Sequence, residues 1–146
     1  AAGPREIIKA IAKIQSQSTS NPTSISQAAA VEALNGKQDF IQERANSFKK
    51  RRDFVVKSLN NIRGISCQKP EGAFYVFLNE KKLIGKKTKI KTDKEFVENL
   101  LEKAEVAVVQ GSAFGLDGYF RISYATSMEN LKKAMERIKS FCESLN

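Results

Sequence analysis

One arginine lies in the middle of a segment whose other residues favour a β-strand. The segment YFRISYAT (119–126) is rich in aromatic and β-branched residues, which suit a pleated, half-buried surface. Side chains alternate along a strand, so Phe120 and Ile122 share one face while Arg121 lies on the other. An arginine keeps its charge in proteins and is almost never fully buried without a partner. Arg121 is therefore expected to meet an anion, and the residues alone favour a structural ion pair with Asp or Glu.

Several kinds of chemistry are excluded by composition. The chain has no histidine, which removes histidine-based triads, most zinc sites and the commonest acid–base catalyst. Its two cysteines, Cys67 and Cys142, are too few for a disulfide framework and lack metal-ligand spacing, which predicts reduced thiols in a cytoplasmic protein. No apolar run approaches the ~20 residues of a membrane span, so no membrane partner is expected.

The net charge of +9 raises the question of nucleic-acid binding. Basic residues cluster at 49–52 and in KKLIGKKTKIKTDK (81–94), but neither cluster has the interleaved aromatic residues of a base-stacking surface. A solvated lysine-rich surface is the favoured interpretation. A basic nucleic-acid-binding module remains the alternative from another class of function.

Helices are expected in the first part of the chain. Pro4 precedes a stripe of isoleucines that predicts a helix, which should dissolve in the polar run 15–21. Asn21 and Pro22 are expected to cap and start a second helix that ends at Asn35-Gly36 with residues that accept a left-handed conformation. A longer helix is expected from Asp39 to about Asn61. The first ~36 residues should pack less well than the rest. Their apolar stripe would then be exposed: Ile7, Ile8, Ile11 and Ile14.

The second part of the chain is expected to form two strands, a helix, two further strands and a final helix, in this order. Strands are expected at 65–67, 73–78, 106–109 and 119–126, with 110–115 as a loop. The two helices follow capping boxes at Thr92-x-x-Glu95 and Thr126-x-x-Glu129. This order predicts an α/β fold of the α+β kind, in which helices cover a small mixed or antiparallel sheet.

Four segments, in this order, resemble the C-terminal part of a fold-type I pyridoxal-phosphate-dependent aminotransferase. They are AAGP (1–4), STSNPTSISQ (18–27), EGAFYVF (71–77) and VAVVQGSAFG (106–115) with FRISYAT after it. The similarity is greatest to bacterial aspartate aminotransferases. It implies that residues 1–38 are a C-terminal remnant of a large cofactor-binding domain, and that residues 39–146 are a connecting helix plus the small C-terminal domain.

The resemblance assigns an anion to Arg121. In this family the arginine of the FRISYAT-like strand binds the α-carboxylate of the amino-acid or keto-acid substrate, and a guanidinium fork fits a carboxylate with two parallel hydrogen bonds. Ser20 and Asn21 match a segment that approaches the active site of the neighbouring subunit in a homodimer; a polar linker without ligand contact is the alternative. One subgroup carries an arginine just before this segment, whereas residues 16–19 here contain none. This departure weakens the expectation of aspartate specificity.

The implied parent enzyme exchanges an amino group between aspartate and 2-oxoglutarate with pyridoxal 5'-phosphate as cofactor. A broader specificity, for aromatic amino acids or prephenate, is the alternative within the enzyme class, and a stand-alone dimerisation domain is another. The family's catalytic lysine and phosphate-binding groups belong upstream of Ala1, and Lys9 and Lys13 do not match the lysine. The chain alone is therefore expected to be inactive, to contain no catalytic residue and to bind no cofactor covalently.

Overall fold

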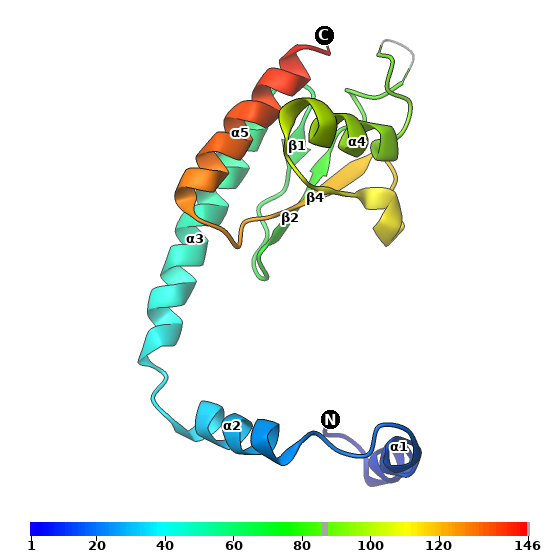
Figure 1. Cartoon of the computed structure of the whole chain (residues 1–146), viewed down its shortest axis with the longest axis vertical. Coiled ribbons are helices and arrows are strands. Elements are labelled where there is room, and N and C mark those ends of the chain that lie inside the picture. Colours follow the sequence, from blue (N-terminus) through cyan, green and yellow to red (C-terminus); the bar gives the residue numbers. More distant parts are fainter. Residues whose placement is uncertain (86–87, 146) are drawn as a thin grey trace. The chain divides into compact units, whose positions relative to one another are not determined.

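The computed structural model describes residues 1–85 and 88–145, in two compact units, Ala1–Ile41 (unit 1) and Gln42–Asn146 (unit 2). Figure 1 shows the course of the chain through the two units. Lys86 and Lys87, which belong to the basic stretch 81–94, lie outside the described residues.

Helices α1 (Arg5–Ser18) and α2 (Ser24–Asn35) form most of unit 1, and neither contains a buried residue. Ile7, Ile11 and Ile14 are exposed, as expected for this apolar stripe, whereas Ile8, which was expected to be exposed with them, is half-buried. Helix α1 continues to Ser18, so the prediction that it dissolves at residue 15 was wrong. The hydroxyls of Ser16 and Ser18 donate to the carbonyls of Lys13 and Ile14, which satisfies these polar side chains within the helix.

Both ends of α2 differ in detail from the prediction. The N-cap is Thr23, whose hydroxyl accepts from the backbone N–H of Ser26 at 3.3 Å, so Asn21 and Pro22 precede the helix instead of starting it. Gly36 does follow the helix, but its backbone is extended at φ −75° and not left-handed. A Cβ at Gly36 would collide with the carbonyl oxygen and the side chain of Glu32, which gives a steric reason for glycine there.

Helix α3 (Asp39–Asn60) has nearly the predicted bounds. Its buried residues, Val55 and Leu59, belong to its C-terminal half and enter the core of unit 2. The long helix is therefore fixed to unit 2 by its apolar end.

The sheet of unit 2 contains β1 (Ser66–Cys67), β2 (Tyr75–Asn79), β3 (Val109–Gln110) and β4 (Tyr119–Ser123). Its order is β1-β2-β4-β3 and every pairing is antiparallel, which selects the antiparallel form of the predicted fold. The strand predicted at 106–109 pairs only at its end. Glu105 adopts a left-handed conformation after α4, and the N–H of Val106 turns back to Leu100, so this stretch closes the helix before it joins the sheet.

Helices α4 (Asp93–Ala104) and α5 (Met128–Glu143) follow the two predicted caps, one of them shifted. Thr92 caps α4 by accepting from the N–H of Glu95 at 3.1 Å, as predicted. The cap of α5 is Ser127, which accepts from the N–H of Asn130, whereas Thr126 accepts from the Asn130 side chain. The predicted capping residue was therefore wrong by one position. A short 3-10 helix, η1 (Gly111–Phe114), replaces the predicted loop.

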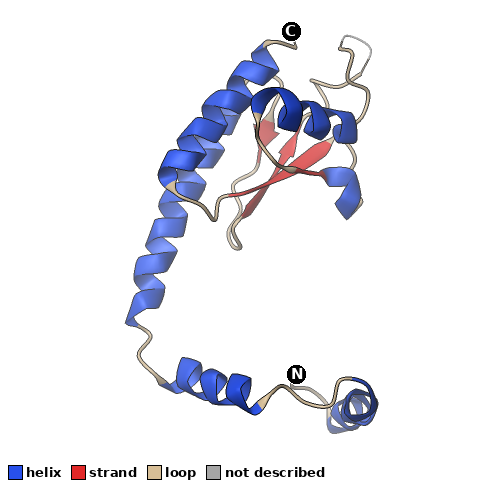
Figure 2. Cartoon of the chain, in the orientation of Figure 1, coloured by secondary structure: helices blue, strands red, loops and turns tan. Residues whose placement is uncertain are grey.

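The hydrophobic core lies between one face of the sheet and the helices of unit 2 (Figure 2). Phe96 of α4 packs against Phe120 of β4 and Phe141 of α5, with ring centroids 5.3 and 5.4 Å apart. Phe120 and Ile122 are buried while Arg121 between them is only half-buried, which confirms the predicted alternation. Cys67 and Cys142 are both buried, and neither forms a disulfide within the described residues. Within the described residues, none of the helices has the length and apolar character that crossing a membrane requires.

Candidate functional site

Arg121 occupies the middle of the central strand pair of the sheet. It lies opposite Phe77 on β2 and opposite Val109 on β3, so β4 is paired along both edges at this residue. Its guanidinium carbon lies over two aromatic rings, 4.2 Å from the Tyr75 centroid and 4.3 Å from the Phe114 centroid. Both distances are well inside the range of a cation–π contact.

Within the described residues, no acidic side chain pairs with the charge of Arg121. Among the residues that the structure describes, its guanidinium forms no ion pair with Asp or Glu, although other arginines do, such as Arg52 with Asp53 at 2.9 Å. The structural ion pair that the residues alone favoured is therefore absent from the described part of the chain. The donors of the guanidinium are left for an anion from outside, and a carboxylate matches their planar fork.

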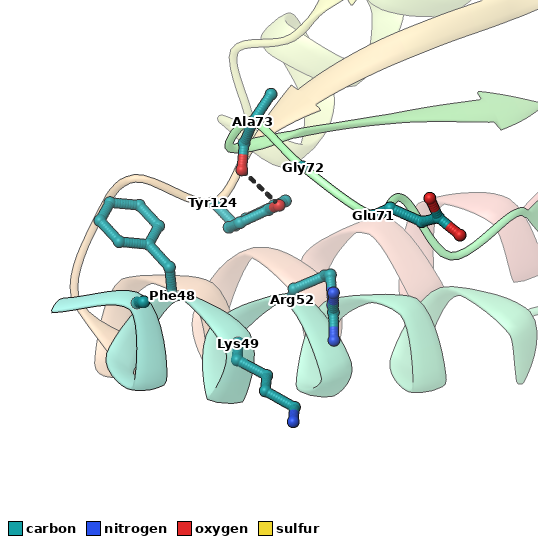
Figure 3. A pocket seen from close by; sticks show the side chains of 8 residues that line it. Phe48, Lys49, Arg52, Glu71, Gly72, Ala73 and Tyr124 are labelled. Atoms are coloured by element: carbon teal, nitrogen blue, oxygen red, sulfur yellow. Dashed lines mark hydrogen bonds between the residues drawn. The ribbon is translucent and has the colours of Figure 1, made fainter. Parts of the chain in front are cut away.

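The ring of Tyr75 is supported by the loop that leads into β2. The Tyr124 hydroxyl donates to the carbonyl of Ala73 at 2.9 Å (Figure 3), and the Tyr124 N–H donates to the carbonyl of Phe74 at 2.9 Å. Ala73 has a positive φ of 59°, a conformation that costs a non-glycine residue free energy. Burial raises the pKa of Tyr124, so its hydroxyl remains a donor at neutral pH. Two hydrogen bonds from one buried tyrosine thus hold a strained turn next to the site.

A cavity of about 530 Å³ lies beside this turn, between α3 and the loop. Figure 3 shows Phe48, Lys49 and Arg52 of α3 on one side of it. Arg52 is held there by its hydrogen bond to the carbonyl of Pro70 at 3.1 Å, besides its contact with Asp53. The charged middle of α3 therefore fastens the helix to the loop.

The ring of Phe114 is supported by the start of α4. The Asp93 carboxylate accepts from the N–H of Ser112 at 2.7 Å, which ties η1 to α4. A Cβ at Gly111 would collide with the carbonyl oxygens of Leu116 and Tyr119, so only glycine allows this close backbone approach. Phe114 also contacts Phe77 edge-to-face, with centroids 5.5 Å apart.

A second cavity, of about 710 Å³, continues along the same face of the sheet toward β1. Tyr75, Phe77 and Tyr119 line it together with residues 66–70. This face therefore offers aromatic surface and open volume next to the arginine, which suits a small organic anion.

Ser20 and Asn21 belong to unit 1, whereas Arg121 belongs to unit 2. Both are exposed, and Ser20 has a positive φ of 61° with its N–H donating to the carbonyl of Gln15 at 2.9 Å. The structure thus brings Arg121 together with Tyr75 and Phe114, and it describes Ser20 and Asn21 only within the turn between α1 and α2.

Two buried acids that the sequence did not single out lie on the helix-covered side of unit 2. Glu80 has no exposed surface, and neither of its carboxyl oxygens has a hydrogen-bond partner in the described structure. Burial, with a smaller contribution from the nearby Asp93 carboxylate, raises the pKa of Glu80 to about 9. Glu80 is therefore neutral at physiological pH, and Asp93 is the carboxylate that binds Ser112.

The two lysines of α1 have little protein around them. Lys9 and Lys13 are exposed in α1, a helix without a single buried residue, so nothing there would shield a bound cofactor from water. No group of three or more Cys, Asp or Glu residues with metal-binding geometry occurs in the part of the chain that is described. Among the described residues, the guanidinium of Arg121 is the group that best suits a small anionic ligand.

Comparisons with known proteins agree with this geometry. Residues 1–138 match the model of the family Aminotransferase class I and II. The chain is 59% identical to an aspartate aminotransferase of Rhizobium meliloti over its whole length, and 57% identical to a probable aspartate/prephenate aminotransferase of Rickettsia typhi over 99% of it. The crystal structure of an aspartate aminotransferase from Rhizobium meliloti superposes on 100% of this chain and 38% of its own, with a TM-score of 0.93.

The fold and the matched sequence define a protein of the aminotransferase fold, and the chain belongs to the class I and II aminotransferase family. Members of this family are pyridoxal-phosphate-dependent transferases of amino groups. The chain spans about 37% of the length of these two curated relatives.

Proposed function

We propose that this chain supplies the substrate α-carboxylate clamp of an aspartate aminotransferase, with Arg121 as the binding residue. The observation that carries the proposal is a guanidinium on a partly open sheet face, stacked on two aromatic rings and without an acidic partner in the described structure. A bidentate pair with Arg121 would fix both oxygens of the α-carboxylate of an amino acid, and this would hold the α-carbon in one orientation. The names of the relatives support aspartate as a substrate. We propose 2-oxoglutarate as the acceptor of its amino group.

The remaining parts of such an enzyme correspond to the length of the relatives that this chain does not span. Pyridoxal phosphate, when bound in an enzyme of this family, accepts the amino group and stabilises negative charge on the substrate's α-carbon. We assign no cofactor-binding residue to this chain. Its own contribution is to bind the carboxylate, to orient it through a rigid strand and to surround it with apolar side chains.

Several finer assignments belong to the same proposal. Residues 1–38 act as part of the large cofactor-binding domain, and residues 39–146 form the connecting helix and small domain. Ser20 and Asn21 approach the active site of the second subunit in a homodimer, for which their exposure leaves them accessible. The enzyme acts in the cytoplasm, in keeping with two cysteines that are not joined in a disulfide, and it binds no nucleic acid.

A second specificity has a separate observation in its favour. The surroundings of Arg121 are unusually aromatic, with Phe74, Phe77 and Phe114 each exposed by 37% or more. Such a surface would also accept the ring of an aromatic amino acid or of prephenate, and one relative is named as a probable aspartate/prephenate aminotransferase. Aspartate alone would leave this apolar area in contact with water or with the rest of the enzyme.

A chimera tests the proposal. This chain would replace the matching 38% of the Rhizobium meliloti enzyme, whose structure it superposes on, and the chimera would be assayed with aspartate and 2-oxoglutarate. Arg121→Lys keeps the charge but loses the second parallel hydrogen bond, so kcat/KM should fall about 10- to 200-fold for every amino-acid substrate, with Tm nearly unchanged. A normal kcat/KM with a lowered Tm would show that Arg121 holds the strand and not the substrate.

A further inference from the structure

We propose that Tyr75 and Phe114 are positioning residues that form an aromatic bracket around the Arg121 guanidinium, so that a carboxylate can meet only its hydrogen-bonding edge. This inference rests on the proposed function of Arg121 and extends it to two residues without a charge. The bracket consists of Tyr75 on β2 and Phe114 on η1, at 4.2 and 4.3 Å from the guanidinium carbon.

The geometry of the guanidinium allows stacking and carboxylate binding at the same time. A guanidinium has two kinds of surface, a flat face that stacks on aromatic rings and an edge of N–H donors that binds carboxylates in its plane. The guanidinium carbon lies over the Tyr75 ring and over the Phe114 ring, and in the proposed bracket these rings cover the flat faces while bidentate binding uses the edge. Stacking and carboxylate binding therefore do not compete for the same surface of Arg121.

The aromatic rings also restrict the rotamers of the Arg121 side chain. A free arginine side chain carries about 2 kcal/mol of rotamer entropy, part of which is lost when it binds a ligand. Rings that already contact the guanidinium on its flat faces remove much of this freedom before the substrate arrives. The bracket therefore makes carboxylate binding tighter and more directional.

The rings of Tyr75 and Phe114 are themselves held in place by their surroundings. Tyr75 pairs with Ser123 in the β2–β4 ladder and follows the turn that Tyr124 holds by its hydrogen bond to Ala73. Phe114 closes a 3-10 helix that the Asp93 carboxylate ties to α4 through Ser112 at 2.7 Å. Each ring reaches Arg121 from a separate and independently anchored element, so two different variants can test the bracket.

The same face contains a matched control. The ring of Tyr119, two residues before Arg121 on β4, contacts the ammonium group of Lys81 at 5.2 Å from its centroid. Tyr119→Leu therefore removes a cation–π contact from the same sheet face, together with the hydrogen bond that the Asn79 side chain donates to the Tyr119 hydroxyl at 3.1 Å, and it leaves both bracket residues in place. Tyr75→Leu and Phe114→Leu make the corresponding change next to Arg121.

The experiment uses the chain itself, labelled with ¹⁵N, and follows the Nε–H signal of Arg121 by NMR. Side-chain relaxation gives the order parameter of this N–H bond, and a titration with sodium acetate against a sodium chloride reference gives the carboxylate affinity. We expect a high order parameter in the wild type and in Tyr119→Leu. In Tyr75→Leu and Phe114→Leu we expect it to fall below about 0.6, the range of flexible groups, with acetate binding weakened about two- to fivefold.

The outcomes separate this inference from the function it extends. The positioning role would be overturned if the order parameter of Arg121 stayed as high in both bracket variants as in Tyr119→Leu. This conclusion would hold whatever the measured affinity for acetate. An Arg121 signal that acetate does not shift in the wild type would count against the carboxylate clamp itself. If the order parameter falls in the bracket variants while acetate affinity stays unchanged, the rings fix the arginine but do not assist binding, and the inference as stated is wrong.

Discussion

Glu80 is expected to make the free energy of unfolding fall as the pH rises. Its carboxyl is fully buried, and neither of its oxygens has a hydrogen-bond partner among the described residues. Burial raises its pKa to about 9 in the folded chain from an ordinary value of 4.5. Between these two values the folded state holds the proton and the unfolded state releases it. A group of this kind stabilises the fold most at low pH and loses that effect as the pH approaches its folded pKa.

The magnitude follows from proton linkage. One proton released on unfolding lowers the free energy of unfolding by about 1.4 kcal/mol per pH unit, so Glu80 alone accounts for about 4 kcal/mol between pH 5 and 8. This is a large part of the 5–15 kcal/mol that an ordinary domain has in total. Glu80→Gln keeps the shape of the neutral side chain but cannot ionise, so it should remove this slope.

Urea unfolding of the wild type and of Glu80→Gln at pH 5, 6, 7 and 8 measures the effect. The difference between the two curves is the informative quantity, because every other titrating group, including Asp93, is present in both proteins. Glu80→Gln should gain stability relative to the wild type with each pH unit. Parallel pH profiles would refute the reasoning, since they would mean that Glu80 is already ionised in the folded chain.

Two further predictions concern backbone details. Ser127→Ala should cost about 1 kcal/mol of stability while Thr126→Ala costs less than half of that, because Ser127 is the residue that caps α5; equal losses in urea unfolding would place the cap elsewhere. Ala73→Gly should raise the free energy of unfolding by about 1 kcal/mol, because glycine tolerates the positive φ of 59°, whereas Ala134→Gly inside α5 should lower it by a similar amount; a loss from both would contradict strain at Ala73.

The architecture was largely predictable because the hydrophobic periodicity of the sequence indicates the type of most elements and their buried faces. The alternation around Arg121 correctly separated the buried face of β4 from the open one, and the antiparallel sheet with its helices lies within the predicted fold class. The error at the start of α5 falls where two neighbouring polar residues can both act as a cap. Thr126 and Ser127 are equally good candidates in the sequence, and only the backbone geometry decides between them.

The candidate site was predictable only in part. Arg121 stood out because it is a charge in an apolar strand, but the bracket residues gave no comparable signal. Tyr75 could be placed on the open face of β2 by alternation, yet its contact with Arg121 depends on the strand register, which opposes Tyr75 to Ser123. Phe114 lies in a 3-10 turn that was predicted as a loop, and Asp93 reaches that turn from 19 residues away along the chain. Contacts of this range follow from tertiary packing and not from local pattern.

The strand order has a consequence for how the arginine can move. Because β4 is hydrogen-bonded to β2 on one side and to β3 on the other, its backbone cannot shift alone without breaking ladder bonds along both edges. A loop-borne arginine could follow a substrate by local rearrangement, whereas this one has only its side-chain torsions, and the aromatic rings restrict those. Any larger approach toward a ligand must carry the entire sheet and its helices as one rigid body. Changes in the reach of Arg121 would then require unit 2 to move as a whole.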